Sequence, residues 1–111
     1  MTDDYFTILP EPPGTGADGV VTSRILLSGE FDLDSRDQLR DAMLAPIDAG
    51  TSGRVVVDMR KVRFIDSEAI SAIIDAFLAA EQAGIVFRLA GTTGIVDRVI
   101  TVVGLGHLVD R

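Results

Sequence analysis

Residues 54–90 read RVVVDMRKVRFIDSEAISAIIDAFLAAEQAGIVFRLA, and this stretch decides the fold. The β-branched runs at 54–59 and 85–90 predict two strands that are buried on both faces. Between them, apolar side chains recur at helical spacing, which predicts an amphipathic helix that begins at Ser67 and ends at Gly84. Residues 61–66 are expected to form only the connector into that helix. A strand, a helix and a second strand in this order favour a parallel pair with the helix packed against it.

Towards the N-terminus, two further strands precede this unit. Residues 5–9 and 20–28 are rich in β-branched and aromatic or aliphatic side chains, and the stretch between them is rich in prolines and glycines. The stretch 10–19 has three prolines and three glycines, so we expect an opening antiparallel hairpin with a flexible Pro/Gly loop at residues 10–19.

Two more helices complete the pattern. Ser35 and Gln38 have the spacing of a capping box at a helix start, and Pro46 is expected to end or kink that helix near Ala45. Thr93 can cap the third helix, and residues 107–109 can form a last short strand. The residues expected on the buried side of the third helix are Ile95, Val96, Val99, Ile100 and Val103.

The predicted order is β-β-α-β-α-β-α-β, an α/β fold with a mixed, mostly parallel sheet and helices packed against it. The chain has 111 residues, which suits a single domain spanning residues 1–111.

Charge and residue usage exclude several classes of function. The net charge is −7 and the pI is near 4.4, which disfavours nucleic acid and anionic membrane surfaces as partners. There is no cysteine, and His107 is the single histidine, so the sequence offers neither a thiol nucleophile nor a Cys/His metal site. We expect a non-enzymatic protein without cofactor or metal. The N-terminus has no signal-peptide pattern and no stretch is long enough to span a membrane, so we also expect a soluble, cytoplasmic monomer.

The chemically interesting stretch is residues 64–68, FIDSE, which leads into the most amphipathic helix. The Ser67 hydroxyl has two possible uses: it can be the N-cap of that helix, or it can accept a phosphate beside the positive end of the helix dipole. Asp32, in the loop after the second strand, is expected near Asp66 if both loops leave the same edge of the sheet. Asp32 and Asp34 can equally be loop and cap residues at a helix entry.

The chain resembles the STAS domain and, within it, the bacterial anti-sigma-factor antagonists, from about residue 20 to the C-terminus. The matching stretches are GEFD at 29–32, VVVDM at 55–59, FIDS at 64–67, RVI at 98–100 and VGL at 103–105. The resemblance implies a STAS-like fold and a binding module that captures an anti-sigma factor with serine kinase activity and so frees a sigma factor. It also implies that the kinase phosphorylates Ser67 and that a serine phosphatase reverses this. The partner-binding residues would be Asp32, Asp34, Ser35, Asp66, Ser67 and Glu68.

Two residues depart from the family pattern. The family usually has a small polar residue and then glycine after the phosphorylated serine, whereas this chain has Glu68 and Ala69. The added methyl and the permanent charge would hinder an arriving kinase and phosphate. They favour the alternative of a non-phosphorylated STAS scaffold or adaptor in a stress-signalling assembly. A nucleotide-binding domain is disfavoured because no phosphate-binding loop is present, and an enzyme is the weakest reading.

Overall fold

The computed structural model describes residues 5–110 as one sheet with helices against it. The strands are paired in the order β1-β3-β4-β5-β6, with the short β2 paired to β3 at the side of this path. Only the pairs of β1 and β2 with β3 are antiparallel; the others are parallel. The strand bounds are β1 Phe6–Pro10, β2 Gly14–Thr15, β3 Val21–Phe31, β4 Arg54–Ile65, β5 Val86–Ala90 and β6 Val109–Asp110. This is the mixed, mostly parallel α/β fold that the sequence predicts.

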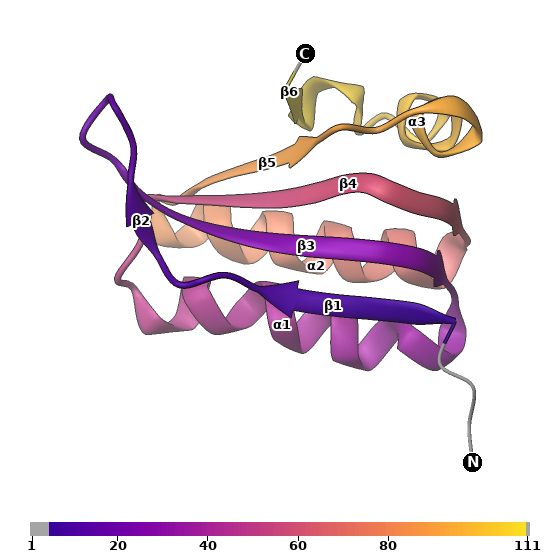
Figure 1. Cartoon of the computed structure of the whole chain (residues 1–111), viewed down its shortest axis with the longest axis horizontal. Helices are drawn as coiled ribbons and strands as arrows, with labels where there is room; N and C mark the ends of the chain where they lie inside the picture. The colour runs from indigo at the N-terminus through magenta and orange to yellow at the C-terminus, as the bar shows by residue number, and fades with distance from the viewer. Residues whose placement is uncertain (1–4, 111) are drawn as a thin grey trace.

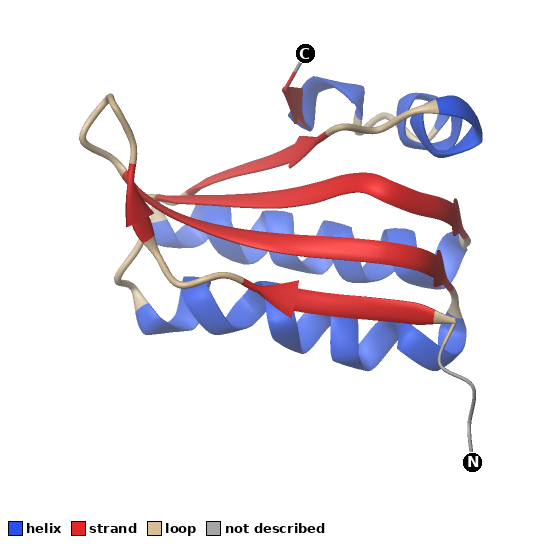
Figure 2. Cartoon of the chain, viewed as in Figure 1, coloured by secondary structure: helices blue, strands red, loops and turns tan. Residues whose placement is uncertain are grey.

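Two long helices, α1 (Arg36–Ala49) and α2 (Ser67–Ala83), lie side by side along one face of the sheet (Figure 1). The shorter α3 (Gly94–Val102) follows β5, and two 3₁₀ turns, η1 (Leu33–Ser35) and η2 (Gly106–Leu108), precede α1 and β6. Figure 2 shows how the strands form one continuous layer against the two long helices. Because β3, β4 and β5 are parallel, their carboxyl ends and the starts of the segments that follow them share one end of the sheet.

The opening hairpin is confirmed, with Phe6 opposite Gly29 and Pro10 opposite Ile25. The Pro/Gly stretch at 10–19 carries structure that the sequence analysis did not predict, because Gly14–Thr15 pairs with β3 as β2. Its turn is closed by the Gly19 amide, which donates to the Gly16 carbonyl at 3.0 Å.

Strand β4 is longer than predicted and absorbs the expected connector at 61–66 as far as Ile65. Its pairing with β3 shifts register twice, so β4 accommodates extra residues as bulges. The sequence analysis expected only a connector in this stretch, which contains the charged residues Lys61 and Arg63. They are compatible with a strand because their side chains lie on its exposed positions.

Helix α1 does not end at Pro46; it continues to Ala49, and Gly50 follows in a left-handed conformation at φ 66°. The expected end near Ala45 was wrong because Pro46 lies in the last turn, where it removes one backbone hydrogen bond while the buried Ile47 still anchors the turn. The N-cap position of α1 is Ser35, as expected, but the capping box lies one turn earlier. Ser35 makes no side-chain cap bond to α1, and Asp32 instead caps η1.

The last helix buries fewer side chains than its periodicity suggested. Val96 and Ile100 are fully buried, but Ile95 is 56% and Val103 45% exposed. The reason is that α3 has only nine residues, so one line of side chains faces the core and Val103 already lies beyond the helix. Thr93 precedes α3 without a side-chain cap bond. The strand predicted at 107–109 is a 3₁₀ turn as far as Leu108, followed by β6.

The core lies between the sheet and the two long helices. Its central side chains include Phe31, Met43, Val57, Ile73 and Leu89, each no more than about 1% exposed. Along β3, buried and partly exposed side chains alternate, so the opposite face of the sheet carries residues such as Thr22, Arg24 and Ser28. The rigid layer therefore holds the carboxyl ends of β3 and β4, and the loops after them, in a fixed relation.

Candidate functional site

The sheet brings the two predicted halves of the site together at the carboxyl ends of β3 and β4. Phe31 and Ile65 are paired as the last residues of these neighbouring parallel strands. The backbone amide of Asp66 donates to the Phe31 carbonyl at 3.1 Å, which places Asp32 and Asp66 at adjacent strand ends. From here β3 enters η1 and β4 enters α2. We call residues 32–36 and 64–68 together the strand-end surface.

Asp66, and not Ser67, is the N-cap of α2. Its Oδ1 accepts hydrogen bonds from the amides of Glu68 and Ala69, both at 3.0 Å, while its own backbone is extended. Ser67 is the first helical residue and is exposed. Within residues 5–110 its hydroxyl has no side-chain hydrogen-bond partner. The N-cap interpretation of Ser67 is therefore wrong, and its hydroxyl is available to other chemistry.

The two residues that depart from the family pattern, Glu68 and Ala69, have different surroundings. Ala69 is fully buried, so its methyl packs in the core and does not obstruct an approach to Ser67. Glu68 is only half-buried, and its Oε1 accepts a hydrogen bond from Nη1 of Arg36 at 2.6 Å. The added negative charge beside Ser67 thus has a cation from the neighbouring helix.

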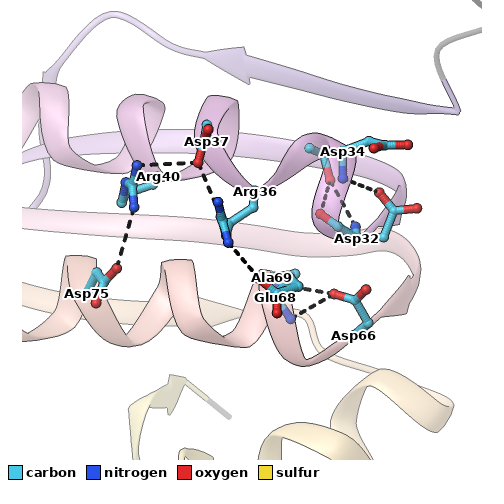
Figure 3. A network of polar contacts seen from close by, with 10 residues as sticks. Asp32, Asp34, Arg36, Asp37, Arg40, Asp66, Glu68, Ala69 and Asp75 are labelled. Carbon is cyan, nitrogen blue, oxygen red and sulfur yellow. Dashed lines mark hydrogen bonds and ion pairs between the residues drawn. The ribbon is translucent and has the colours of Figure 1, made fainter.

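Arg36 and Arg40 form a chain of ion pairs between α1 and α2 (Figure 3). Arg36 also contacts Asp37 at 3.2 Å, and Arg40 joins Asp37 at 3.3 Å to Asp75 on α2 at 3.9 Å. The hydrogen bond to Glu68 is the largest cause of the raised pKa of the Arg36 guanidinium. Sequence analysis missed this network because it joins residues of two helices. The available signal was that Glu68 and Asp75, seven residues apart, lie on the same face of one helix.

The η1 half of the surface is held by reciprocal hydrogen bonds. The Asp32 carboxylate accepts from the amide of Asp34 at 3.0 Å, and the Ser35 hydroxyl accepts from the amide of Asp32 at 2.9 Å. Ser35 is fully buried, which makes it a structural residue here. Tyr5 reaches across from the start of the chain, and its phenol donates to Asp32 Oδ2 at 3.2 Å and to Asp34 Oδ2 at 3.1 Å.

The pKa of the Tyr5 phenol responds to the negative charges of Asp32 and Asp34. The hydrogen bond to Asp34, together with burial and Asp32, raises the pKa of the phenol from 10.0 to about 12. Losing its proton would place a third negative charge beside the two carboxylates, which is why the neutral phenol is favoured. Sequence analysis did not include Tyr5, and no local motif identifies a contact between residues this far apart in the chain.

The strand-end surface combines unbalanced negative charge with exposed apolar side chains. Within the described part of the chain, Asp32, Asp34 and Asp66 have no ion-pair partner. Leu33, between the first two, and Phe64, two residues before Asp66, are 57% and 47% exposed. Such a surface is complementary to a partner that presents a basic group among apolar ones.

Other features of the described residues lie away from this surface. A shallow hollow of about 660 Å³ lies at the opposite end of the strands and is lined by residues that include Thr22, Arg54 and Val86. No group of three or more potential metal ligands gathers among residues 5–110. None of the helices described is long and apolar enough to cross a membrane.

Comparison with known proteins gives a family match and several similar folds. Residues 17–110 match the family described as "Mlab, STAS domain". The structure of the anti-sigma factor antagonist SpoIIAA of Bacillus in its unphosphorylated form is similar, with a TM-score of 0.79 and 20% identity over 94% of this chain and 86% of that one. An anti-sigma factor antagonist from Mycobacterium paratuberculosis has a TM-score of 0.77 and 22% identity over 96% of this chain and 84% of that one.

The same fold occurs in a different setting. A sulfate transporter family protein from Wolinella succinogenes matches with a TM-score of 0.68 and 17% identity, covering 86% of this chain and 84% of that one. No curated protein matches the chain in sequence. Because these sequence identities are low, the structural matches show a shared fold and do not show a shared function.

Proposed function

The chain belongs to the STAS domain family, and from this premise we propose that it is an anti-sigma-factor antagonist controlled by phosphorylation of Ser67. Its strand-end surface would bind an anti-sigma factor that is also a serine kinase, and this binding would free a sigma factor. The observation that carries the proposal is the exposed, unpartnered Ser67 hydroxyl at the start of α2, next to the capping carboxylate of Asp66.

Binding would use the charge and shape of the unmodified surface. Asp32, Asp34 and Asp66 have no cation of their own within residues 5–110, so a basic side chain of the partner would find three carboxylates. Leu33 and Phe64 would supply apolar contact. Glu68 would act mainly as the partner of Arg36, and Ser35 as the buried support of the η1 turn.

Phosphorylation would reverse this complementarity. The Ser67 oxygen would bond to the γ-phosphorus of ATP, the bond from that phosphorus to ADP would break, and the hydroxyl proton would be lost. The product adds a charge of about −1.5 to −2 to a surface that is already negative. Desolvating this charge at an interface costs several times the thermal energy, so the phosphorylated form would separate from the partner. A serine phosphatase would restore the binding form by hydrolysis.

The relatives support the proposal. SpoIIAA has been solved in an unphosphorylated and a phosphorylated form, and the mycobacterial neighbour is described as an anti-sigma factor antagonist. The further proposals that go with this function are a monomeric domain spanning residues 1–111 and action in the cytoplasm, without catalysis or cofactor of its own.

Intact-mass spectrometry tests the proposal directly. The protein is incubated with kinase-type anti-sigma factors of its own source, Mg²⁺ and ATP, beside Ser67→Ala and the matched control Ser71→Ala, an exposed serine one turn further along α2. We expect one added phosphate in the original protein and in Ser71→Ala, and none in Ser67→Ala. A phosphate that Ser67→Ala still acquires to the same extent would contradict the assignment.

A second candidate function is a constitutive STAS scaffold that is never phosphorylated. Glu68 beside Ser67 is the observation that favours it, and the fold match to a sulfate transporter family protein gives it a precedent in another setting. Binding of the anti-sigma factor without any added phosphate would favour a constitutive binder. If the protein neither binds the anti-sigma factor nor gains a phosphate, the scaffold function is favoured.

A further inference from the structure

Arg36 contacts the residue that follows the proposed acceptor site, and its present contacts can be exchanged. It is the first residue of α1 and is partly exposed, and its Nη1 donates to Glu68 at 2.6 Å while its Nε donates to Asp37 at 3.2 Å. Glu68 directly follows Ser67. Both residues belong to the first turn of α2, the turn that Arg36 approaches from α1.

The start of α2 leaves few donors for such a phosphate. A helix N-terminus ordinarily offers free amides to an anion, but here the amides of Glu68 and Ala69 already donate to Asp66 Oδ1. Many charged groups on the elements around the site are acidic: Asp32 and Asp34 on η1, Asp37 on α1, and Asp66 and Glu68 at the start of α2. Of the other cations on α1 and β4, Arg40 pairs with Asp37 and Asp75, Arg63 pairs with Glu30 at 3.8 Å, and Lys61 is exposed.

We propose that Arg36 is the phosphate-binding residue of the Ser67 switch. In the unmodified protein its guanidinium neutralises Glu68, and when Ser67 carries a phosphate the guanidinium transfers to the phosphate oxygens, leaving Glu68 without its cation. A guanidinium prefers the phosphate because the dianion carries more charge and can accept two parallel hydrogen bonds. The inference rests on the proposed function of Ser67 and adds how the modified surface is organised. Modification then exposes two new negative groups to a partner, the phosphate and the released Glu68 carboxylate.

The test places phosphoserine at position 67 during translation, so that it depends on neither a kinase nor a partner. A ³¹P NMR titration gives the second pKa of the phosphate, which is ordinarily about 6. We expect Arg36→Gln to raise this pKa by about 0.5 to 1, because the cation that stabilises the dianion is gone. The matched control Arg40→Gln, one turn along α1 in the same ion-pair chain, leaves it unchanged. Equal pKa values in Arg36→Gln and the parent would overturn the proposal.

The guanidinium itself gives a second readout. The ¹H–¹⁵N signal of Arg36 Nε should shift on phosphorylation and move again as the phosphate titrates, and an unmoved signal would overturn the transfer. Arg36→Lys keeps the positive charge but replaces the forked guanidinium with one ammonium group. We therefore expect the phosphate pKa in this variant to stay close to that of the parent. The Nε signal of the protein that keeps Arg36 leaves the proposal testable if Arg36→Gln does not fold. A kinase assay that fails while these titrations succeed would refute the proposed function and leave the role of Arg36 intact.

Discussion

Asp66 and Ser67 are neighbours with separate tasks. The Asp66 carboxylate satisfies two amides at the start of α2, whereas the exposed Ser67 hydroxyl has no side-chain hydrogen bond within residues 5–110. An aspartate followed by a serine at a helix start offers two candidate caps in sequence. The structure chooses Asp66 because it has extended backbone and the Ser67 backbone is already helical.

Two single substitutions separate these tasks. We expect Asp66→Ala to lower the free energy of unfolding by about 1 kcal/mol through loss of the cap. We expect Ser67→Ala to change it by less than about 0.5 kcal/mol, as for an ordinary surface position. Urea denaturation of both variants beside the parent measures the difference. Equal losses in the two variants would contradict the assignment of the cap.

At the scale of elements, β4 depends on Asp58. Two residues of β4, Met59 and Arg60, stand opposite the single Leu27 of β3, and the displaced Arg60 amide donates to Asp58 Oδ1 at 3.1 Å. The Arg60 guanidinium also binds this carboxylate, with Nη2 to Oδ2 at 2.8 Å. Burial pushes the pKa of Asp58 up, but the hydrogen bonds from Arg60 outweigh it, and the pKa lies below its usual value of 3.8.

This arrangement predicts an acid-sensitive strand. A lowered pKa in the folded state means that Asp58 stabilises the fold at any pH above 3.8, and that this contribution is lost as the pH falls through the folded pKa. We expect Asp58→Asn to cost about 2 kcal/mol at pH 7 and much less near pH 2. Urea denaturation at both pH values checks this, with the exposed Asp48→Asn as control. A loss that is independent of pH would refute the role of the charge.

The elements also show what sequence alone could predict. The strand and helix at 54–83 were predictable because long apolar runs and a clear helical period leave one interpretation. The end of β4 was not, because it depends on two shifts of its register with β3, one between Asp58 and Lys61 and one between Val62 and Phe64. The passage of α1 through Pro46 was also not predictable, since it depends on how Ile47 packs in the core.

At the scale of the whole molecule, the start of the chain braces the strand-end surface. Tyr5 lies just before β1, and its phenol bonds to Asp32 and Asp34, which are 27 and 29 residues away. Gly29 makes this approach possible: its φ is 97°, and a Cβ there would collide with the Tyr5 carbonyl oxygen. The Asp32–Asp66 juxtaposition followed from the strand order, but this brace and the Arg36–Glu68 pair did not. Both require knowing which side chains meet across separate elements.

Tyr5 is the single tyrosine and the chain has no tryptophan, so an ultraviolet titration reports on this brace alone. We expect phenolate absorbance to appear with a midpoint near pH 12 and to move towards 10 in Asp34→Asn. The exposed Asp37→Asn should leave the midpoint in place. Since the folded pKa is the higher one, the contribution of Tyr5 to stability is complete below pH 10 and is lost as the pH rises through 12. A parent midpoint near 10 would mean that the brace does not form in solution.

The division between Asp66 and Ser67 has a consequence for how such domains diverge. Because folding relies on the aspartate, a lineage can discard the serine without weakening the helix and still inherit a working binding surface. If Ser67 is the phosphorylated residue that we propose, a mutation at position 67 would convert a regulated protein into a permanent binder in a single step, and selection could reverse that step as easily. Asp66 has no such freedom, so we expect descendants to vary at the serine and to keep the aspartate.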